Sequence, residues 1–406
     1  MTTTQRPRIL FVTTVAATAR HFLAPYAIHL RSRGLTVDVA ANGADRDAAL
    51  HHAFDRVYEL ALSRSMRDVF GHVRGARRIR RILSAGYEIV HVHTPIAAFV
   101  TRAVIRTLPP SGRPKVVYTA HGFHFHRHGH RATNALFLLI ERVGGRWTDR
   151  LVVINDDDHE AALRHRIVPP RNLVRMPGIG LDTSLYVRSR VDPVELARIR
   201  TDLGILAGAP IFTVVGELNR NKRPTDAVRA LARMNHRDAH LVFVGDGRDR
   251  GHLCDVAARI GVRDRVHTVG FVTDVQPFVA IATALVMTSR REGLARSIME
   301  ALCLEVPVLA TDARGNRELV DADGIIVPIG DVNSLARGMD WLIEHPEEMR
   351  AMGQHGRARM VGTYDVRTLT LRHERLYAEL LGLSLQPPGA SLNCRPASRP
   401  ACDNGQ

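Results

Sequence analysis

Short runs of β-branched and other apolar residues alternate with longer amphipathic segments along most of the chain. In the first half these runs are ILFVTT (9–14), TVDVA (36–40), EIVHVH (88–93), KVVYTA (115–120) and RLVVIN (150–155). After residues 183–193 the alternation restarts with IFTVVG (211–216), HLVFVG (240–245), RVHTVG (265–270), ALVMTS (284–289), VPVLAT (306–311) and GIIVPI (324–329). The pattern is typical of β-α-β units in a parallel sheet, and its restart predicts two doubly wound α/β domains.

The length agrees with this division, because 406 residues exceed what one ordinary core holds. We expect a Rossmann-like domain over 1–185, a second over 194–364, and a helix over 365–383 that packs back on the first. Residues 384–406 are polar and proline-rich without periodicity, which predicts a disordered tail. Ligands bind beyond the carboxyl ends of such strands, so two facing domains would form a cleft.

Composition places the chain in an ordinary soluble class. Its apolar fraction is 45%, and no apolar run reaches the roughly 20 residues that a membrane-spanning helix needs. The start has some features of a secretory signal, but its apolar part is short and β-branched, and an amphipathic segment follows over 20–33, so a first β-strand is favoured. The four cysteines have neither metal-ligand spacing nor a disulfide pattern, which favours a reducing cytoplasm; they are Cys254, Cys303, Cys394 and Cys402.

A formal charge of +15 and a pI near 10.7 indicate attraction to anionic partners. The segment RDVFGHVRGARRIRRIL (67–83) could form a helix that contacts anionic lipid headgroups through its basic face while its apolar face packs inward, so that the protein would be peripheral on the inner face of the plasma membrane. A merely solvated helix explains it equally well. A nucleic-acid-binding protein is disfavoured, because aromatic residues make up only 5% and no basic stripe carries interleaved stacking residues.

Two strand-to-helix turns of the second half carry charged residues. GELNRNKRP (216–224) can aim the cations Arg220, Lys222 and Arg223 at a phosphate, although a solvated basic loop is the alternative. SRREGLARSIMEA (289–301) offers Glu292 from a loop and Glu300 from the start of a helix near Ala295. Carboxylates accept hydrogen bonds from sugar hydroxyls, and helix-start N–H groups suit a diphosphate. Alternatively, the two acids only balance the helix dipole and pair with nearby arginines.

These motifs together resemble glycosyltransferase family 4, whose members are retaining enzymes of the GT-B fold. The resemblance rests on GELNRNK, VGDG (244–247), GFVTDV (270–275) and EGLARSIMEALCLEVPVLATDARGNRELV (292–320). In the first half, LFVTTVAATARHFLAPYAIHLRSRGLTVDVAAN, HVHTPIAAF and YTAHGFHF resemble the branch that builds capsule, exopolysaccharide or O-antigen repeats. It covers roughly residues 8 to 380, and its most specific element is the pair of glutamates with seven residues between them.

The resemblance implies a role for each matching position. Lys222, helped by Arg220, would hold the donor diphosphate, and Glu300 would bind the ribose hydroxyls. The catalytic positions would be Glu292, which holds hydroxyls of the transferred sugar, and His121, near that sugar and the acceptor. The other implied donor-binding positions are Gly216, Val272, Gly293, Leu294, Ala295 and Arg296. Implied acceptor-side positions are His21, Phe123 and His124.

Departures from the family pattern limit what can be carried over. The glycine-rich first loop of many members is missing, since TTVAATARHF follows the first strand. Glu217 stands where many members have an arginine beside the lysine. Ala295 and Arg296 occupy the loop in which donor sugars are discriminated, so the sugar cannot be copied from relatives. We expect a UDP-linked donor and an acceptor that is a glycan or a polyprenyl-diphosphate-linked saccharide.

No cofactor or metal ion is expected. The acidic triplets at 45–47, 156–158 and 321–323 match a metal-binding pattern of the other large glycosyltransferase fold, but so short a pattern recurs by chance. HFHRHGHR (124–131) alternates histidines without supporting acids or cysteines and is a weak metal signal. The rival enzyme prediction is a sugar-nucleotide epimerase or hydrolase of the same fold.

Overall fold

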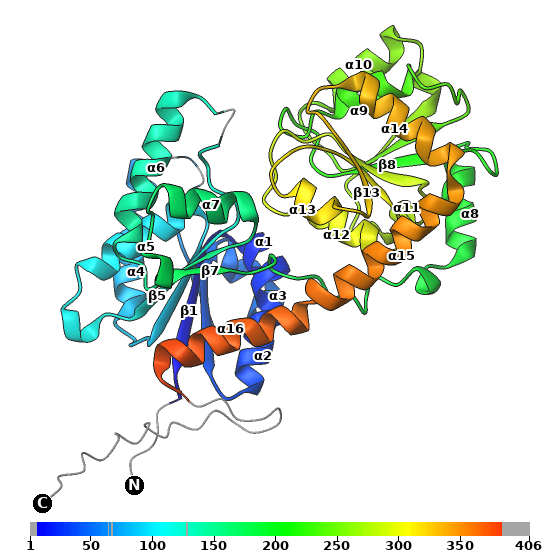
Figure 1. Ribbon diagram of the computed structural model, residues 1–406. Coiled ribbons are helices and arrows are strands. Elements are labelled where there is room, and N and C mark those ends of the chain that lie inside the picture. The colour runs from blue at the N-terminus through cyan, green and yellow to red at the C-terminus, as the bar shows by residue number, and fades with distance from the viewer. Residues whose placement is uncertain (1–5, 64, 66–67, 127–128, 384–406) are drawn as a thin grey trace, which may run out of the picture. The chain divides into compact units, whose positions relative to one another are not determined.

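A computed structural model describes residues 6–63, 65, 68–126 and 129–383 (Figure 1). The chain divides into two compact units. Unit 1 holds residues up to 154, 158–179 and the chain from 367 onward, and unit 2 holds 155–157 and 180–366. The predicted disordered tail, 384–406, lies outside the described residues.

Unit 1 is built on a parallel sheet of seven strands in the order β3-β2-β1-β4-β5-β6-β7. The strands are β1 (Arg8–Val15), β2 (Thr36–Asn42), β3 (Arg56–Glu59), β4 (Ile89–His93), β5 (Lys115–Ala120), β6 (Arg150–Val153) and β7 (Leu173–Arg175). The five predicted strands are all present. The two edge strands, β3 and β7, were not predicted, because each is short and neither is buried as the central ones are.

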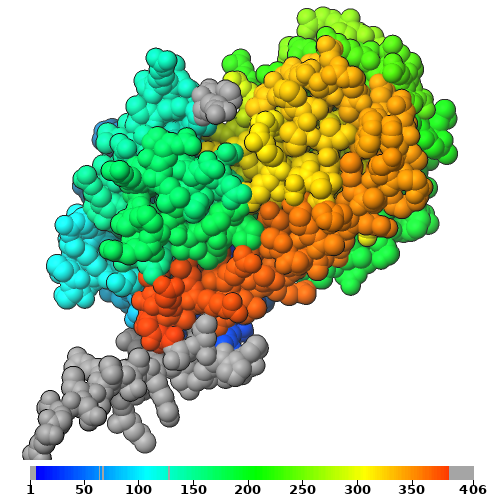
Figure 2. Space-filling model, in the orientation of Figure 1, coloured from blue at the N-terminus to red at the C-terminus, as the bar shows by residue number. Residues whose placement is uncertain are grey.

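Helices cover both faces of this sheet. They are α1 (Ala16–Thr18), the π-helical turn η1 (Ala19–Leu23), α2 (Ala24–Ser32), α3 (Ala48–Ala53), α4 (Val69–Leu83), α5 (Pro95–Arg106), α6 (Arg131–Gly145), α7 (Asp156–Arg164) and α16 (Val366–Leu381). Alternate residues of β1 point to opposite faces of the sheet, and each face has its own apolar core. Leu10 packs in one core with α4 and α5, and Phe11 packs in the other with α2 and α16. The last helix, red in Figure 2, therefore completes the core of unit 1 from the far end of the chain.

Unit 2 holds a second parallel sheet, of six strands in the order β10-β9-β8-β11-β12-β13. The strands are β8 (Ile211–Val215), β9 (His240–Val244), β10 (Val266–Gly270), β11 (Ala284–Met287), β12 (Val308–Thr311) and β13 (Gly324–Val327). The helices are α8 (Pro193–Asp202), α9 (Pro224–Leu231), α10 (Arg250–Arg259), α11 (Gln276–Ala280), α12 (Arg296–Cys303), α13 (Asn316–Val320), α14 (Val332–Glu344) and α15 (Pro346–Thr363). The predicted pair of doubly wound parallel α/β domains is confirmed.

The apolar face of the basic helix differs from its prediction. Ile79, Ile82 and Leu83 of α4 are buried as expected, but Val69 and Phe70 at its start are 61% and 83% exposed. The last turns of α4 therefore cover the core, whereas the apolar side chains of its first turn are exposed to solvent. Within the described ranges, no helix is long and apolar enough to cross a membrane.

Candidate functional site

The turn between β8 and α9 is shaped by Gly216 and Asn219. Gly216 has φ 145°, a conformation that side-chain-bearing residues rarely adopt, and a Cβ there would lie 3.3 Å from Lys222 Cε. The Asn219 side chain accepts hydrogen bonds from the backbone N–H groups of Asn221 (3.0 Å) and Lys222 (3.1 Å). This Asx-type turn folds the loop back, so that the Lys222 side chain passes over the Gly216 backbone.

The same loop is tied to the loop after β11. The Asn221 side chain donates to Arg291 O at 3.0 Å, and the Arg290 N–H donates to Asn221 O at 2.8 Å. Lys222 Nζ consequently lies 2.9 Å from Glu292 Oε1, and both side chains are largely buried, with 21% and 13% exposure. The contact is an ion pair without hydrogen-bond geometry, and Glu292 Oε1 has no hydrogen-bond partner among the described residues. The structure thus brings together two residues that were predicted from separate motifs.

A second carboxylate, that of Glu300, lies in α12 one turn after its first residue, Arg296. Glu300 Oε1 accepts hydrogen bonds from Arg296 Nε at 2.8 Å and from the Tyr186 hydroxyl at 2.9 Å. Arg296 also donates from Nη2 to the Tyr186 hydroxyl oxygen at 3.3 Å. Burial, reinforced by the Glu300 carboxylate, raises the pKa of Tyr186 to about 12, so the phenol keeps its proton at neutral pH. If Glu292 had no binding role, it was expected to pair with Arg290 or Arg296; instead Glu292 lies against Lys222, and Arg296 pairs with Glu300.

Tyr186 is a site residue that the sequence did not indicate. It lies in the irregular segment between the two predicted domains, in no recognised motif, and a lone tyrosine there carries no pattern. Only the folded chain reveals that its hydroxyl reaches α12.

The Glu292 loop is packed closely against the start of α13. Gly315 has φ 81°, and a Cβ on it would overlap the carbonyl oxygen of Gly293. Leu294 packs partly into the core of unit 2, and the Ala295 side chain is buried at the N-cap of α12. These residues therefore present backbone rather than side chains, and no side chain in the described residues caps this helix start.

The remaining donor-side positions lie apart from Lys222. Arg220 is exposed and lines a separate hollow of about 500 Å³, which does not include Lys222. Val272 is half-buried directly after β10. Arg220 and Lys222 thus face different hollows, although only one residue, Asn221, separates them in the loop.

His121 follows β5 in unit 1, beside His93 at the end of β4. His93 Nδ1 lies 3.0 Å from His121 Nε2, and the Phe22 ring, from the π-helical turn η1, stacks on His121 at 6.3 Å between centroids. Burial, with a smaller repulsion from His373, lowers the pKa of His121 to about 4, so the ring is neutral at physiological pH. His93 Nε2 has no hydrogen-bond partner in the described chain, and an unpaired buried acceptor costs less than an unpaired N–H. We therefore assign the shared proton to His93 Nδ1, which places the His121 proton on Nδ1.

The three acceptor-side positions differ in how far their side chains are buried. His21 is exposed within η1, and the ring of His124 lies 5.0 Å from that of Phe137. The Phe123 ring is buried in the core and stacks on Phe125 at 5.0 Å. The Phe123 side chain therefore supports the fold rather than facing a ligand.

The acidic triplets have structural roles. Asp47 caps α3, Asp158 accepts from the backbone N–H of Phe123, and Asp323 pairs with Arg359. In the part of the chain that the structure describes, no three His, Cys, Asp or Glu side chains are grouped to hold a metal ion. Residues 127 and 128 of the histidine-rich segment lie outside that part.

Comparison with known proteins gives this geometry a context. Two family models match the chain, Glycosyltransferase Family 4 over residues 23–183 and Glycosyl transferases group 1 over residues 197–359. The chain is 30% identical to EpsD of Bacillus subtilis (strain 168), over 89% of this chain and 94% of EpsD. EpsD is named as a glycosyltransferase, and the name states neither donor nor acceptor. The chain belongs to glycosyltransferase family 4. His121 falls in the segment matched by the first model, and Lys222, Glu292 and Glu300 fall in the segment matched by the second.

This family 4 glycosyltransferase is also similar to a named enzyme in sequence and to a solved crystal structure in fold. An Escherichia coli enzyme, UDP-Gal:alpha-D-GlcNAc-diphosphoundecaprenol alpha-1,3-galactosyltransferase, is 23% identical over 73% of this chain and 76% of its own length. The crystal structure of Anabaena Alr3699/HepE in complex with UDP and glucose superposes with a TM-score of 0.77, covering 92% of this chain and 100% of that one at 19% identity. This structural likeness agrees with the GT-B fold that the sequence predicted.

Proposed function

We propose that this glycosyltransferase transfers a sugar, with retention of anomeric configuration, from a UDP-sugar to a glycan or a polyprenyl-diphosphate-linked saccharide during cell-surface polysaccharide synthesis. The observation that carries the proposal is the meeting of Lys222 and Glu292, a cation and a carboxylate from two loops beyond the ends of β8 and β11. Support for the substrate classes comes from the Escherichia coli relative, which is named for a UDP-sugar and a diphosphoundecaprenol acceptor.

In the proposed roles, unit 2 binds the donor. Lys222 holds the diphosphate together with N–H groups at the start of α12, and Glu300 accepts hydrogen bonds from the ribose. Glu292 Oε1, which has no hydrogen-bond partner among the described residues, receives hydroxyls of the transferred sugar. Fixed charges of this kind act most strongly where water is excluded, and both Lys222 and Glu292 are largely buried.

Departure of the nucleoside diphosphate is the demanding part of the reaction, because negative charge collects on its phosphates. Lys222 stabilises that charge in the proposed scheme, and a donor phosphate oxygen takes the proton of the acceptor hydroxyl on the same face of the sugar. Glu292 then positions the sugar and forms no covalent bond to it. His121 in unit 1, neutral and with its proton on Nδ1, donates a hydrogen bond near the sugar and the acceptor.

A thermal-shift panel of nucleoside diphosphates and nucleotide-sugars tests the donor assignment, since a ligand stabilises the folded state according to its affinity. UDP and a UDP-sugar should raise Tm in wild type and should do so much less in Lys222→Ala. Equal stabilisation by all nucleotides, unchanged in Lys222→Ala, would contradict the proposal.

Product analysis separates transfer from its rival. An epimerase or hydrolase consumes donor without an acceptor, whereas a transferase should consume it only when acceptor is added. Turnover should also persist in the presence of a chelator, because Lys222 supplies the charge in the proposed scheme. Loss of turnover that manganese restores would contradict the metal-free scheme.

A further inference from the structure

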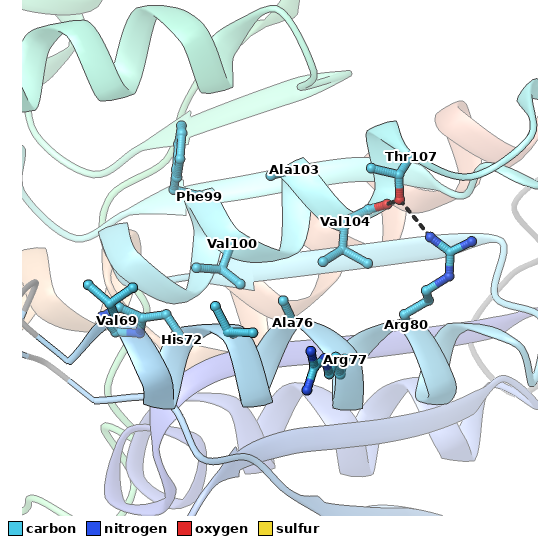
Figure 3. Close-up of a pocket in the computed structure, with 11 residues that line it drawn as sticks. Val69, His72, Ala76, Arg77, Arg80, Phe99, Val100, Ala103, Val104 and Thr107 are labelled. Atoms are coloured by element: carbon cyan, nitrogen blue, oxygen red, sulfur yellow. Dashed lines mark hydrogen bonds between the residues drawn. The ribbon is translucent and has the colours of Figure 1, made fainter.

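An apolar groove runs between α4 and α5 on the surface of unit 1 (Figure 3). Its volume is about 470 Å³, and it is lined by Phe99, Val100, Ala103 and Val104 of α5 and by Thr107, the residue after that helix. From α4 it is lined by one stripe of the helix, which consists of Val69, His72, Val73, Ala76, Arg77 and Arg80. A smaller hollow of about 160 Å³ shares His72, Phe99 and Val100 with it and continues toward α6.

The groove opens beside apolar side chains that the core does not use. Phe70 is 83% exposed, and Val69 and Val73 on the same turns of α4 are also exposed. An exposed aromatic next to an apolar groove leaves a large unfavourable contact with water, which is typical of a surface that binds a partner. The sequence did not predict this feature, because α4 was expected to turn these residues inward.

The same helix carries a dense positive charge. Five arginines of α4 are exposed, and the helix contains no acidic residue; they are Arg74, Arg77, Arg78, Arg80 and Arg81. Arg80 donates to Thr107 at the end of the groove, and the other four form no ion pair with any carboxylate in the described chain. The groove is thus apolar inside and flanked by cations that have no internal counter-ion.

We propose that the α4–α5 surface docks the protein on a bilayer that contains anionic phospholipid. Phe70, Val69 and Val73 would enter the boundary between headgroups and acyl chains, and the arginines would contact phosphate-bearing headgroups at the same depth. Apolar and basic groups in this arrangement match the two layers of an anionic membrane surface. The inference goes beyond the proposed transfer reaction and does not depend on which sugar is moved.

Two other occupants fit the surface less well. A second copy of the chain would place two sets of five arginines against each other across a two-fold interface, with no acid on either helix to compensate them. A nucleic acid would use the arginines but would leave an apolar groove with a single exposed aromatic, Phe70, on α4.

Vesicle co-sedimentation of the full-length protein tests the proposal. Wild type should bind vesicles with about one-third phosphatidylglycerol and should bind pure phosphatidylcholine vesicles far less, with the difference shrinking as salt is raised from about 0.1 M to about 0.5 M. Arg74→Glu/Arg78→Glu should weaken binding to the anionic vesicles at least about tenfold. Phe70→Ser should weaken it severalfold at both salt concentrations, because its contribution is not electrostatic.

The control is a matched charge reversal on the opposite face of the same sheet. Arg372 and Arg375 are exposed on α16, which packs on the other side of β1 from α4. Arg372→Glu/Arg375→Glu has the same change in net charge and should retain binding within about twofold, because the groove is untouched. Equal losses in the two double variants would mean that only net charge matters, and they would overturn the proposal.

Two further outcomes would also overturn it. One is failure of the folded wild type to bind anionic vesicles at low salt. The other is a concentration-dependent dimer that Phe70→Ser dissolves, since the groove would then bind a second copy. The thermal-shift test of donor binding is done without vesicles. If the protein fails to bind vesicles, the proposed sugar transfer is therefore neither supported nor contradicted.

Discussion

Lys222 Nζ lies 2.9 Å from Glu292 Oε1, so the cation proposed to hold the donor diphosphate is paired with the carboxylate proposed to hold its sugar. A diphosphate carries more negative charge than one carboxylate and should draw Lys222 away from Glu292. The freed carboxylate can then accept hydrogen bonds from the sugar. Diphosphate binding and sugar positioning are coupled in this arrangement, because each needs the same ion pair to open.

Removal of either partner should reduce turnover strongly. Lys222→Ala and Glu292→Ala should each lower kcat/KM at least about a hundredfold, the effect of losing one fixed group that stabilises charge in a transition state. Steady-state kinetics with purified protein measure it, and circular dichroism reports whether the fold is intact. The sequence offers one matched control, because Lys115 is the only other lysine. It is half-exposed and pairs with Asp149, so Lys115→Ala should stay within about twofold of wild type.

The Tyr186 hydroxyl should matter for donor binding more than for chemistry. Tyr186→Phe removes one hydrogen bond to Glu300 and leaves Arg296 to orient the carboxylate. The loss of one such bond costs about 1 kcal/mol, so we expect KM for the donor to rise about fivefold while kcat changes less than about twofold. If kcat fell a hundredfold with KM unchanged, Glu300 and its partners would act on the transition state instead.

Stability should fall with acidification because of a group of neutral histidines in unit 1. Burial lowers the pKa of His91 and His93 well below the ordinary value, and lowers that of His121 and of His373 to about 4. The unfolded chain takes up protons near pH 6.5, where these folded-state rings do not, so the free energy of unfolding is at its full value above that pH and is lost toward pH 4. Four such histidines give a slope of at most about 5.5 kcal/mol per pH unit.

Urea denaturation between pH 8 and pH 5 measures that slope. His373 packs against Tyr26 at 4.7 Å, and His373→Phe keeps an aromatic ring there while removing one titrating group. The variant should lose roughly one quarter less stability than wild type over the same interval, whatever its stability at pH 8. An identical slope in both proteins would exclude His373 from the effect.

The sequence predicted the central strands because each is largely buried between helices and reads as a nearly continuous apolar run, as in HLVFV of β9. It missed β3 and β7, which are short edge strands with mixed composition. It placed Lys222 and Glu292 in loops at one edge of a sheet, since parallel strands end at the same side. It could not give their contact, because that depends on Asn221 joining the two loops, nor the role of Tyr186, which no local pattern marks.

Gly315 should control the Glu292 loop from outside any ligand contact. Its φ of 81° disfavours a side chain, and a Cβ would overlap the carbonyl oxygen of Gly293, so Gly315→Ala must displace the backbone that follows Glu292. We expect a loss of about 1–3 kcal/mol in the free energy of unfolding and at least about a tenfold fall in kcat/KM, because misplaced groups lose alignment with the substrate. Gly362→Ala is the matched control. Gly362 lies in α15 with no atom within 4 Å of an added Cβ, so this change should keep activity and raise stability by up to about 1 kcal/mol. Wild-type kinetics in Gly315→Ala would show that the loop tolerates displacement and that its backbone does not position the sugar.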